Sequence, residues 1–298
     1  MFNFSRADFR TTFCSEQRRR ATKSKAMPMV VRARPIGTRL QPRPAMWCGP
    51  KMAIVPATTI TATPKISIWS PPPDWTRTAF QPVGPEFFPR GRGTPNQEGL
   101  DFYDRLTDAM LDRGLKPCAT LYHWELPVAL ADLGGWRNPD MPNWFADYTE
   151  VIMSRIGDRM FSVAPINEPW CVGWLSHFLG HHAPGLRDIR ATAHAMHHVL
   201  VAHGKAIQTM RGLGMSNLGG VFNMEWATPA DDSDAAKSAA ALYDGYYNHF
   251  FLSGVFKGAY PENVMEGLGP HMPNGWQDDF DVIQSPLDWC GINYYTRK

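Results

Sequence analysis

The stretch Lys116–Glu125 reads KPCATLYHWE, and the stretch Met160–Pro169 reads MFSVAPINEP. Each begins with an apolar run of strand length and ends in polar or aromatic residues. Leu218–Asn223 and Leu287–Asn293 repeat the pattern. Helical periodicity of apolar residues fills the intervals at about 96–115, 142–156, 189–211 and 235–251. Four strand–helix periods of this kind predict a parallel α/β sheet.

The polar ends of the four predicted strands suggest where chemistry would occur. They read HWE, NEPW, NMEW and NYY in chain order. In a parallel barrel the catalytic groups gather at the carboxyl ends of the strands, whereas a doubly wound sheet favours a glycine-rich phosphate turn. No GxGxxG or GxxxxGK[ST] motif occurs. The pattern therefore favours a (β/α)8 TIM barrel that acts on an uncharged polar ligand and implies no cofactor.

The residues at these strand ends suit a sugar. Indole rings stack on the CH faces of a sugar, while amide and imidazole groups bind its hydroxyls. The pattern places four tryptophans near the strand ends: Trp124, Trp170, Trp174 and Trp226. Cleavage of a glycosidic bond needs two carboxyl groups. Glu168 is the first candidate, and Glu125 and Glu225 are weaker ones.

Six motifs carry a resemblance to a known family. They are YHWELP at 122–127, GGWRN at 134–138, INEPW at 166–170, GHHAPG at 180–185, FKGAYP at 256–261 and GINYY at 291–295. Their order and spacing resemble those of family 1 glycoside hydrolases, the β-glucosidase family. The resemblance implies a retaining β-glucosidase that hydrolyses O-glycosidic bonds, with a β-linked glycoside or oligosaccharide as its partner and no role for nucleic acid or a membrane.

The resemblance also assigns roles to six residues. Glu168 would be the catalytic acid/base, and the substrate-binding set would be His123, Trp124, Asn167, Asn293 and Tyr295. Asn167 and His123 would bind sugar hydroxyls, and Trp124 would form part of the pocket wall. Tyr295 would lie against the nucleophile and Asn293 would help to orient it.

One expected element of the family pattern is not found. The nucleophile of the family lies in a TENG-like motif after the seventh strand, and no TENG string occurs in this sequence. Only strands three to six of the barrel are recognisable, so we expect an incomplete barrel. The alternative to a working hydrolase is a noncatalytic, truncated or frameshifted relative without glycosidase activity.

The first third of the chain differs in composition from the rest. Residues 1–97 contain sixteen Lys or Arg against four Asp or Glu, whereas the remainder contains fourteen against twenty-four. We therefore divide the chain into an aberrant, basic, Pro- and Arg-rich segment at 1–90 and a partial glycosidase barrel at 91–298. The segment could be a basic nucleic-acid arm, an organellar transit segment or disordered filler.

A shifted reading frame accounts for more of the first segment. In this shifted frame, each new codon combines the third base of one codon with the first two bases of the next. Codons that encode Thr58–Trp69, TTITATPKISIW, can then also encode DHYHRYPEDIDL. Thr11–Ala26 permits DDFLFGAATSSYQIEG in the same frame, and both strings resemble the amino-terminal part of the family. We therefore expect residues from about Thr11 to Arg90 to be an out-of-frame translation and disordered.

Two further features bear on location and on metals. The five cysteines are widely spaced without a CxxC pair, which favours a reducing compartment, so a cytoplasmic location is expected. His194, His197 and His198 share one helical stretch. Without an HExxH motif they are expected to pack or be solvated, and no metal is assigned.

Overall fold

A computed structural model describes residues 52–54, 77–82, 84, 88 and 90–297 of the chain. The strands are β1 (Met52–Ile54), β2 (Arg77–Phe80), β3 (Lys116–Tyr122), β4 (Ser162–Ile166), β5 (Gly219–Trp226) and β6 (Trp289–Arg297). The α-helices are α3 (Gln97–Leu111), α4 (Val128–Asp132), α5 (Met141–Ile156), α6 (Ile189–Gly212), α7 (Asp234–Asp244), α8 (Phe250–Lys257), α9 (Glu262–Leu268) and α10 (Phe280–Ile283).

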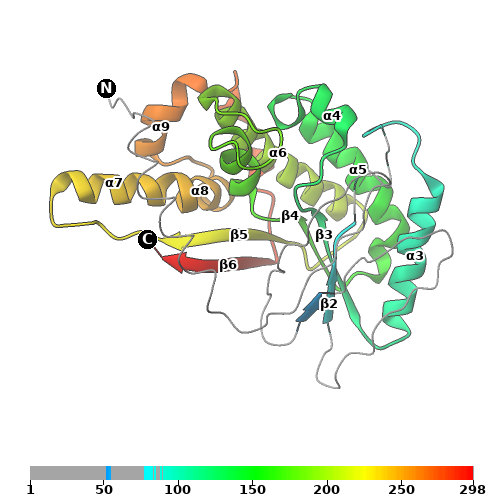
Figure 1. Ribbon diagram of the computed structural model, residues 1–298. Helices are drawn as coiled ribbons and strands as arrows, with labels where there is room; N and C mark the ends of the chain where they lie inside the picture. The colour runs from blue at the N-terminus through cyan, green and yellow to red at the C-terminus, as the bar shows by residue number, and fades with distance from the viewer. Residues whose placement is uncertain (1–51, 55–76, 83, 85–87, 89, 298) are drawn as a thin grey trace.

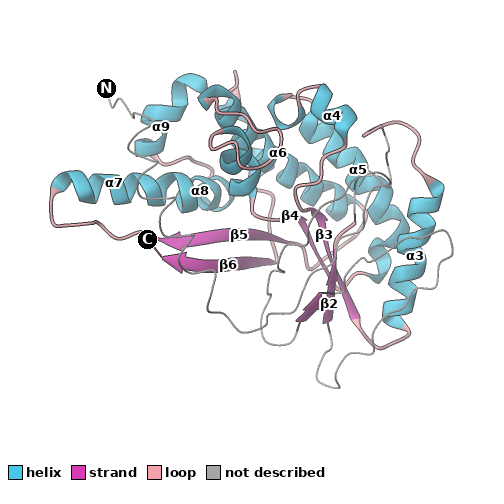
Figure 2. Ribbon diagram, in the orientation of Figure 1, coloured by secondary structure: helices cyan, strands magenta, loops and turns pink. Residues whose placement is uncertain are grey.

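The described strands are parallel and follow chain order. One sheet has the order β1-β2-β3-β4, and β5 pairs with β6. Two parallel bridges, Val163 to Leu218 and Asn167 to Val221, join β4 to β5. Each strand therefore runs parallel to its neighbour, so that the carboxyl ends follow one edge, although β5 and β6 point in a different direction from β3 and β4 in Figure 2. This confirms the predicted parallel α/β architecture.

Helices cover the sheet on one side (Figure 1), and the long helix α6 lies at the centre of the core. Asp188 caps its N-terminus, since Oδ1 accepts the amide of Ala191 at 2.7 Å. From there to Met210 most of its side chains are buried. Such all-round burial is typical of a helix inside a layered fold, where neighbours contact it from several sides.

The close packing of α6 against α10 depends on one glycine. A Cβ atom at Gly204 would overlap the backbone carbonyl of Val282. Only glycine allows this approach of the two backbones. Gly212, at the other end of the same helix, has open space around it.

The structure differs from the sequence prediction in two helices. The predicted helix at 235–251 is divided into α7 and α8 by a π-helical turn at Gly245–His249. The division comes at Gly245, where a Cβ would press against Val264 of α9. In the helix predicted at about 96–115, the apolar residue Leu111 is 40% exposed, and α3 ends at this residue.

The predicted aberrant segment at 1–90 lies mostly outside the described residues. Two short strands nevertheless occur within it, where no strand motif was recognised. β2 pairs with β3 in parallel, with Ala79 opposite Cys118. The buried ring of Phe80 stacks on Tyr103 of α3 at 6.2 Å. The local sequence RTAF is too short to show the alternation of side chains that is typical of a strand. This strand is therefore defined by its pairing with β3 and not by its own sequence.

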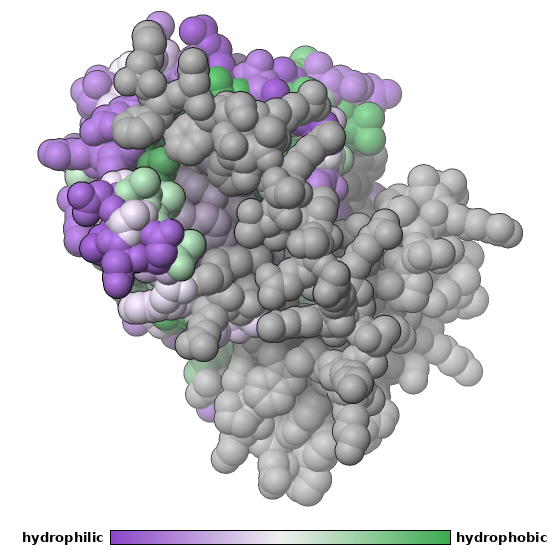
Figure 3. All heavy atoms as spheres, turned by 60° about the vertical axis from the view of Figure 1, so that its left-hand side comes forward, coloured by the Kyte–Doolittle hydropathy of each residue, from purple (hydrophilic) through white to green (hydrophobic). Residues whose placement is uncertain are grey.

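Figure 3 shows one face of the molecule, on which part of the described region is visible. On the face shown in Figure 3, hydrophilic side chains predominate, with scattered hydrophobic ones between them. No helix in the described part of the chain has the length and apolar character needed to cross a membrane.

Candidate active site

All six residues predicted for the site lie at the carboxyl edge of the sheet, on three strands. His123 and Trp124 follow β3, Asn167 and Glu168 follow β4, and Asn293 and Tyr295 belong to β6. The structure thus brings together residues that are up to 172 positions apart in the printed sequence. We refer to these six residues as the Glu168 cluster.

Backbone contacts fix the end of β4 between its two neighbours. The amide of Asn167 donates to the carbonyl of Tyr122 at 3.0 Å, and the amide of Glu168 donates to that of Val221 at 2.9 Å. Glu168 and Trp124 have positive φ angles of 50° and 81°. Residues with a side chain rarely adopt this left-handed conformation, and such strain is concentrated at functional sites.

Asn167 connects three other members of the cluster. Its Oδ1 accepts the Asn293 amide at 3.2 Å, and its Nδ2 lies 3.4 Å from Nε2 of His123. Its backbone carbonyl accepts Nε1 of Trp124 at 2.9 Å. Each polar group of Asn167 therefore has a defined partner, which holds the imidazole and the indole beside the carboxylate.

The Glu168 carboxylate is buried, with 3% of the residue exposed, and hydrogen-bond donors reach both of its oxygens. Oε1 accepts the Asn293 amide at 2.7 Å and the Tyr295 hydroxyl at 2.6 Å. Oε2 accepts the Cys171 thiol at 3.2 Å. Burial, followed by the neighbouring Glu168 carboxylate, raises the pKa of the Cys171 thiol well above its usual value, so it remains a protonated donor.

Cys171 is the site residue that the sequence prediction missed. It appeared there only as one of five unpaired cysteines. The signal that could have found it is its position three residues after Glu168, within a helical stretch in which such residues are neighbours.

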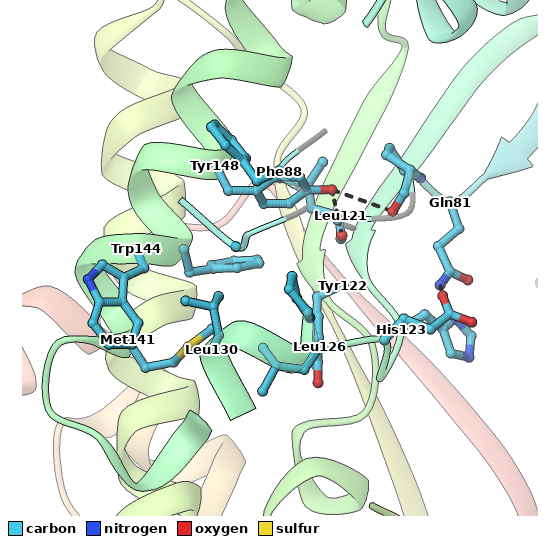
Figure 4. A pocket seen from close by; sticks show the side chains of 16 residues that line it. Gln81, Phe88, Leu121, Tyr122, His123, Leu126, Leu130, Met141, Trp144 and Tyr148 are labelled. Atoms are coloured by element: carbon cyan, nitrogen blue, oxygen red, sulfur yellow. Dashed lines mark hydrogen bonds between the residues drawn. The ribbon is translucent and has the colours of Figure 1, made fainter. Parts of the chain in front are cut away.

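The two weaker carboxylate candidates have other partners. Glu125 Oε2 accepts Nε2 of Gln81 at 3.1 Å, and Glu225 Oε2 accepts the hydroxyl of Tyr243. Figure 4 shows Gln81 and His123 at one side of a pocket that extends away from the cluster. The lining of this pocket is mostly apolar, with Leu121, Leu126, Leu130, Met141, Trp144 and Phe145 among its members. Its hydrogen-bonding members include Gln81, His123 and Glu125, and Gln81 and His123 lie at the side shown in Figure 4.

Aromatic rings form a wall behind Glu168. Trp170 packs on Tyr247 with ring centroids 4.2 Å apart, and Trp174 stacks on Tyr246 at the same distance. Both tryptophans are buried. Trp226 differs from the other predicted sugar-stacking residues, because it is 63% exposed on the outer end of β5.

His194, His197 and His198, three of the four histidines of α6, have protein partners. His197 is fully buried between the hydroxyl of Tyr260 at 2.8 Å and the carboxylate of Asp279 at 2.9 Å. His198 contacts the carbonyl of Trp136 at 2.9 Å. In the described part of the chain no three His, Cys, Asp or Glu side chains are grouped so that they could hold a metal ion.

With this geometry established, comparison with known proteins assigns the family. The family model described as glycosyl hydrolase family 1 matches residues 83–298. The chain belongs to glycosyl hydrolase family 1.

Two curated family 1 relatives indicate how much of the chain the similarity covers. A β-glucosidase of Agrobacterium sp. is 44% identical over 218 residues, which are 73% of this chain and 48% of the relative. β-Glucosidase A of Thermotoga maritima is 39% identical over 214 residues, or 71% of this chain and 48% of the relative. The chain thus spans about half the length of the curated relatives it matches.

A solved structure confirms the family 1 fold. The family 1 β-glucosidase from Thermotoga maritima superposes with a TM-score of 0.72 at 37% identity, over 75% of this chain and 50% of that one. The sequential parallel strands β1 to β6 are therefore part of a (β/α)8 barrel. The Glu168 cluster occupies the face of the barrel where active sites occur.

Proposed function

We propose that the protein acts as a retaining glycoside hydrolase on β-glucosides, with Glu168 as the general acid/base. The observation that carries this proposal is the buried Glu168 carboxylate, held at the carboxyl edge of a family 1 barrel by the Asn293 and Tyr295 donors. An acid/base must be held in a defined direction to reach the glycosidic oxygen, and the three donors around it provide this orientation.

The neighbouring residues suit recognition of a sugar ring. The His123 imidazole and the Asn167 amide offer groups that can bind adjacent hydroxyls, and they are already linked to each other. The half-buried indole of Trp124 lies beside His123 at a centroid distance of 4.8 Å and offers an apolar face. The names of the relatives, β-glucosidases and a 1,4-β-D-glucan glucohydrolase, support a β-linked glucosyl substrate.

A retaining mechanism also needs a nucleophilic carboxylate about 5 Å from the acid. The sequence analysis assigns no nucleophile, and the two weaker carboxyl candidates, Glu125 and Glu225, each accept a hydrogen bond from another residue, Gln81 or Tyr243. Trapping of the covalent intermediate identifies the nucleophile without prior assignment. A 2-deoxy-2-fluoroglucoside with an activated leaving group forms a stable glycosyl ester, which peptide mass spectrometry locates.

The test of the proposal is hydrolysis of an aryl β-glucoside by the full chain. Turnover is expected to fall by at least about a hundredfold in Glu168→Gln, because the isosteric amide cannot donate the proton. Asp231→Asn is the matched control, because this exposed carboxylate accepts the amide of Ser233 and is not a member of the cluster. Unchanged turnover in Glu168→Gln would exclude the acid/base role.

A second candidate function is a noncatalytic relative. One observation favours it: Oε1 of Glu168 is bound by the two residues expected to serve the nucleophile. In that case calorimetry would detect binding of a glucose-type inhibitor that is lost in His123→Ala, while no glycosyl ester would form. Formation of the ester would exclude this candidate.

We also propose that residues 1–90 are an out-of-frame translation. The family match begins at residue 83, close to the predicted boundary, although the family resemblance in the shifted frame extends upstream. Resequencing the DNA that encodes this segment tests the idea. A sequence that excludes the codons for DHYHRYPEDIDL would contradict it.

A cytoplasmic location is part of the proposal. Cys171 and Cys290 are free thiols. The thiol of Cys171 lies beside Glu168, and its oxidation would alter the site. A reducing compartment preserves this contact, and fractionation of cells that express the protein would test it.

A further inference from the structure

The two oxygens of the Glu168 carboxylate are held by different parts of the chain. Oε1 is bound by Asn293 and Tyr295 of β6, whereas Oε2 is bound by the thiol of Cys171, at 3.2 Å. Rotation of a carboxylate about its last bond is soft, so donors on one oxygen leave its plane poorly defined. The contact on the second oxygen fixes that plane.

The main chain connects Cys171 to Glu168 as well. The amide of Cys171 donates to the carbonyl of Glu168 at 2.9 Å, and Cys171 begins the π-helical turn that runs to Leu175. Cys171 is 5% exposed, and the tryptophans that lie close to it in the sequence, Trp170 and Trp174, are buried too. The thiol therefore has little freedom to move away from the carboxylate.

A thiol suits the chemistry of an acid/base. S–H is a weak donor and sulfur is a weak acceptor. When Glu168 is ionised, the thiol donates to Oε2; when Oε2 carries the proton, the hydroxyl can donate to Sγ. The Asn293 amide offers only hydrogens to Oε1, so it cannot reverse its contact in the same way. The Tyr295 hydroxyl could reverse its contact as well, but Oε1 already accepts from both Asn293 and Tyr295, so the proton is better placed on Oε2, whose single partner accommodates both protonation states.

We propose that Cys171 is a positioning residue for Glu168, which holds Oε2 through a reversible thiol hydrogen bond. The inference rests on the proposed role of Glu168 as acid/base. It extends that role by assigning the proton to one oxygen and by naming the residue that directs it.

The contact itself can be tested without any enzymatic activity. In protein labelled with ¹³C at the cysteine Cβ atoms, NMR follows each thiol as it ionises, and Cys171→Ala assigns the signal. Burial and, after it, the Glu168 carboxylate oppose formation of the thiolate, so in Glu168→Gln the titration midpoint of Cys171 should fall. Cys118 is the internal control, because its thiol points to the carbonyl of Lys116. An unchanged midpoint of Cys171 would overturn the proposal.

The pH–rate profile tests the positioning role. Cys171→Ser replaces a weak donor with a stronger one, which favours the ionised acid and should move the basic limb to lower pH by about half a unit or more. Cys171→Val keeps the volume but removes the donor, and should move the limb to higher pH. If Cys171 only fills space, its replacement would change stability but leave both limbs of the pH–rate profile in place. That result would also overturn the proposal.

The two experiments separate the proposals. If the thiol midpoint falls in Glu168→Gln but no variant hydrolyses a glucoside, the contact stands and the proposed function fails. If hydrolysis depends on Glu168 but the thiol midpoint does not move, the function stands and the inference fails. Should Glu168→Gln not fold, as judged by circular dichroism, Glu168→Asp lengthens the contact and should give a smaller fall of the same sign.

Discussion

The hydroxyl of Tyr295 lies 2.6 Å from Oε1 of Glu168, although 127 positions separate the two residues in the chain. The neighbouring residue Tyr294 extends from the same strand and is exposed to a similar degree, 57% against 55%. One tyrosine of the pair therefore reaches the buried carboxylate while the other does not bind it. Strand β6 contributes to the site through alternate side chains.

Replacement of Tyr295 by Phe should destabilise the fold by about 1 kcal/mol. The change removes a donor from a buried carboxylate, but the tyrosine is half exposed and water can partly replace it. Urea unfolding measures the difference. Tyr294→Phe is the matched control and should stay within about 0.5 kcal/mol of the wild type. Equal losses in the two variants would show that the hydroxyl contact contributes nothing.

Gly204→Ala should destabilise the protein by about 1–3 kcal/mol or more, because the new Cβ would collide with the backbone carbonyl of Val282. Gly212→Ala, in the same helix, has no atom within 4 Å of the new methyl and should be neutral or more stable by up to about 1 kcal/mol. Thermal unfolding of the two variants distinguishes close packing from helix propensity. A Gly204→Ala protein as stable as Gly212→Ala would contradict the packing of α6 on α10.

Trp136→Phe should cost about 1–3 kcal/mol of unfolding free energy. Trp136 is 3% exposed, and its Nε1 donates to the buried hydroxyl of Tyr122 at 3.0 Å. The phenyl ring leaves this hydroxyl without that donor and leaves space where the indole was. Trp226→Phe changes an exposed indole and is expected to have little effect. Guanidinium unfolding of both proteins provides the comparison.

Stability should fall as the pH is lowered from about 6.5 toward about 4, and His203 is one cause. Burial lowers the pKa of His203 to about 4 from 6.5. Its Nε2 has no hydrogen-bond partner among the described residues. Because the unfolded chain binds the proton first, the stability present above pH 6.5 is lost on acidification, by up to about 1.4 kcal/mol per pH unit.

His203→Gln removes this titration. The slope of the unfolding free energy against pH should therefore decrease by the amount that corresponds to about one proton. His198, whose pKa is also lowered to about 4 by burial, keeps part of the slope. His181→Gln changes an exposed histidine and serves as the control. Unfolding free energies at several pH values give the slopes. Parallel curves for His203→Gln and the wild type would contradict a buried neutral imidazole.

The periodic elements of the fold could be predicted from local sequence. The strand predicted at 116–122 has the same bounds in β3, and the helix predicted at 189–211 differs from α6 by one residue. Both have a clear apolar period and clear end signals. The π-helical turn at Gly245 was not predicted, and the close approach of Val264 to this glycine is a tertiary contact that local sequence does not place. The strand β2 was missed for the same reason, since its partner β3 is distant in sequence.

The predicted residues of the site lie together, but their partners differ from those expected. Asn293 and Tyr295 were predicted beside a nucleophile, and in the structure they bind Glu168. Strand-end position indicates that residues share an edge, whereas the choice of hydrogen-bond partner depends on side-chain geometry. The roles of the six residues in catalysis and binding stay predictions, to be tested by the variants proposed above.

The parallel order of the strands also has a kinetic consequence. The Asn293 amide that binds Glu168 follows it by 125 positions, so this contact closes a very long loop of chain. Contacts of such high sequence separation form slowly, because the entropy of loop closure is lost before the contact stabilises anything. We therefore expect the site to be among the last parts of the molecule to form. During refolding, binding of a ligand to the Glu168 cluster would then recover only when β6 has paired. This recovery should follow the formation of helices α3, α5 and α6.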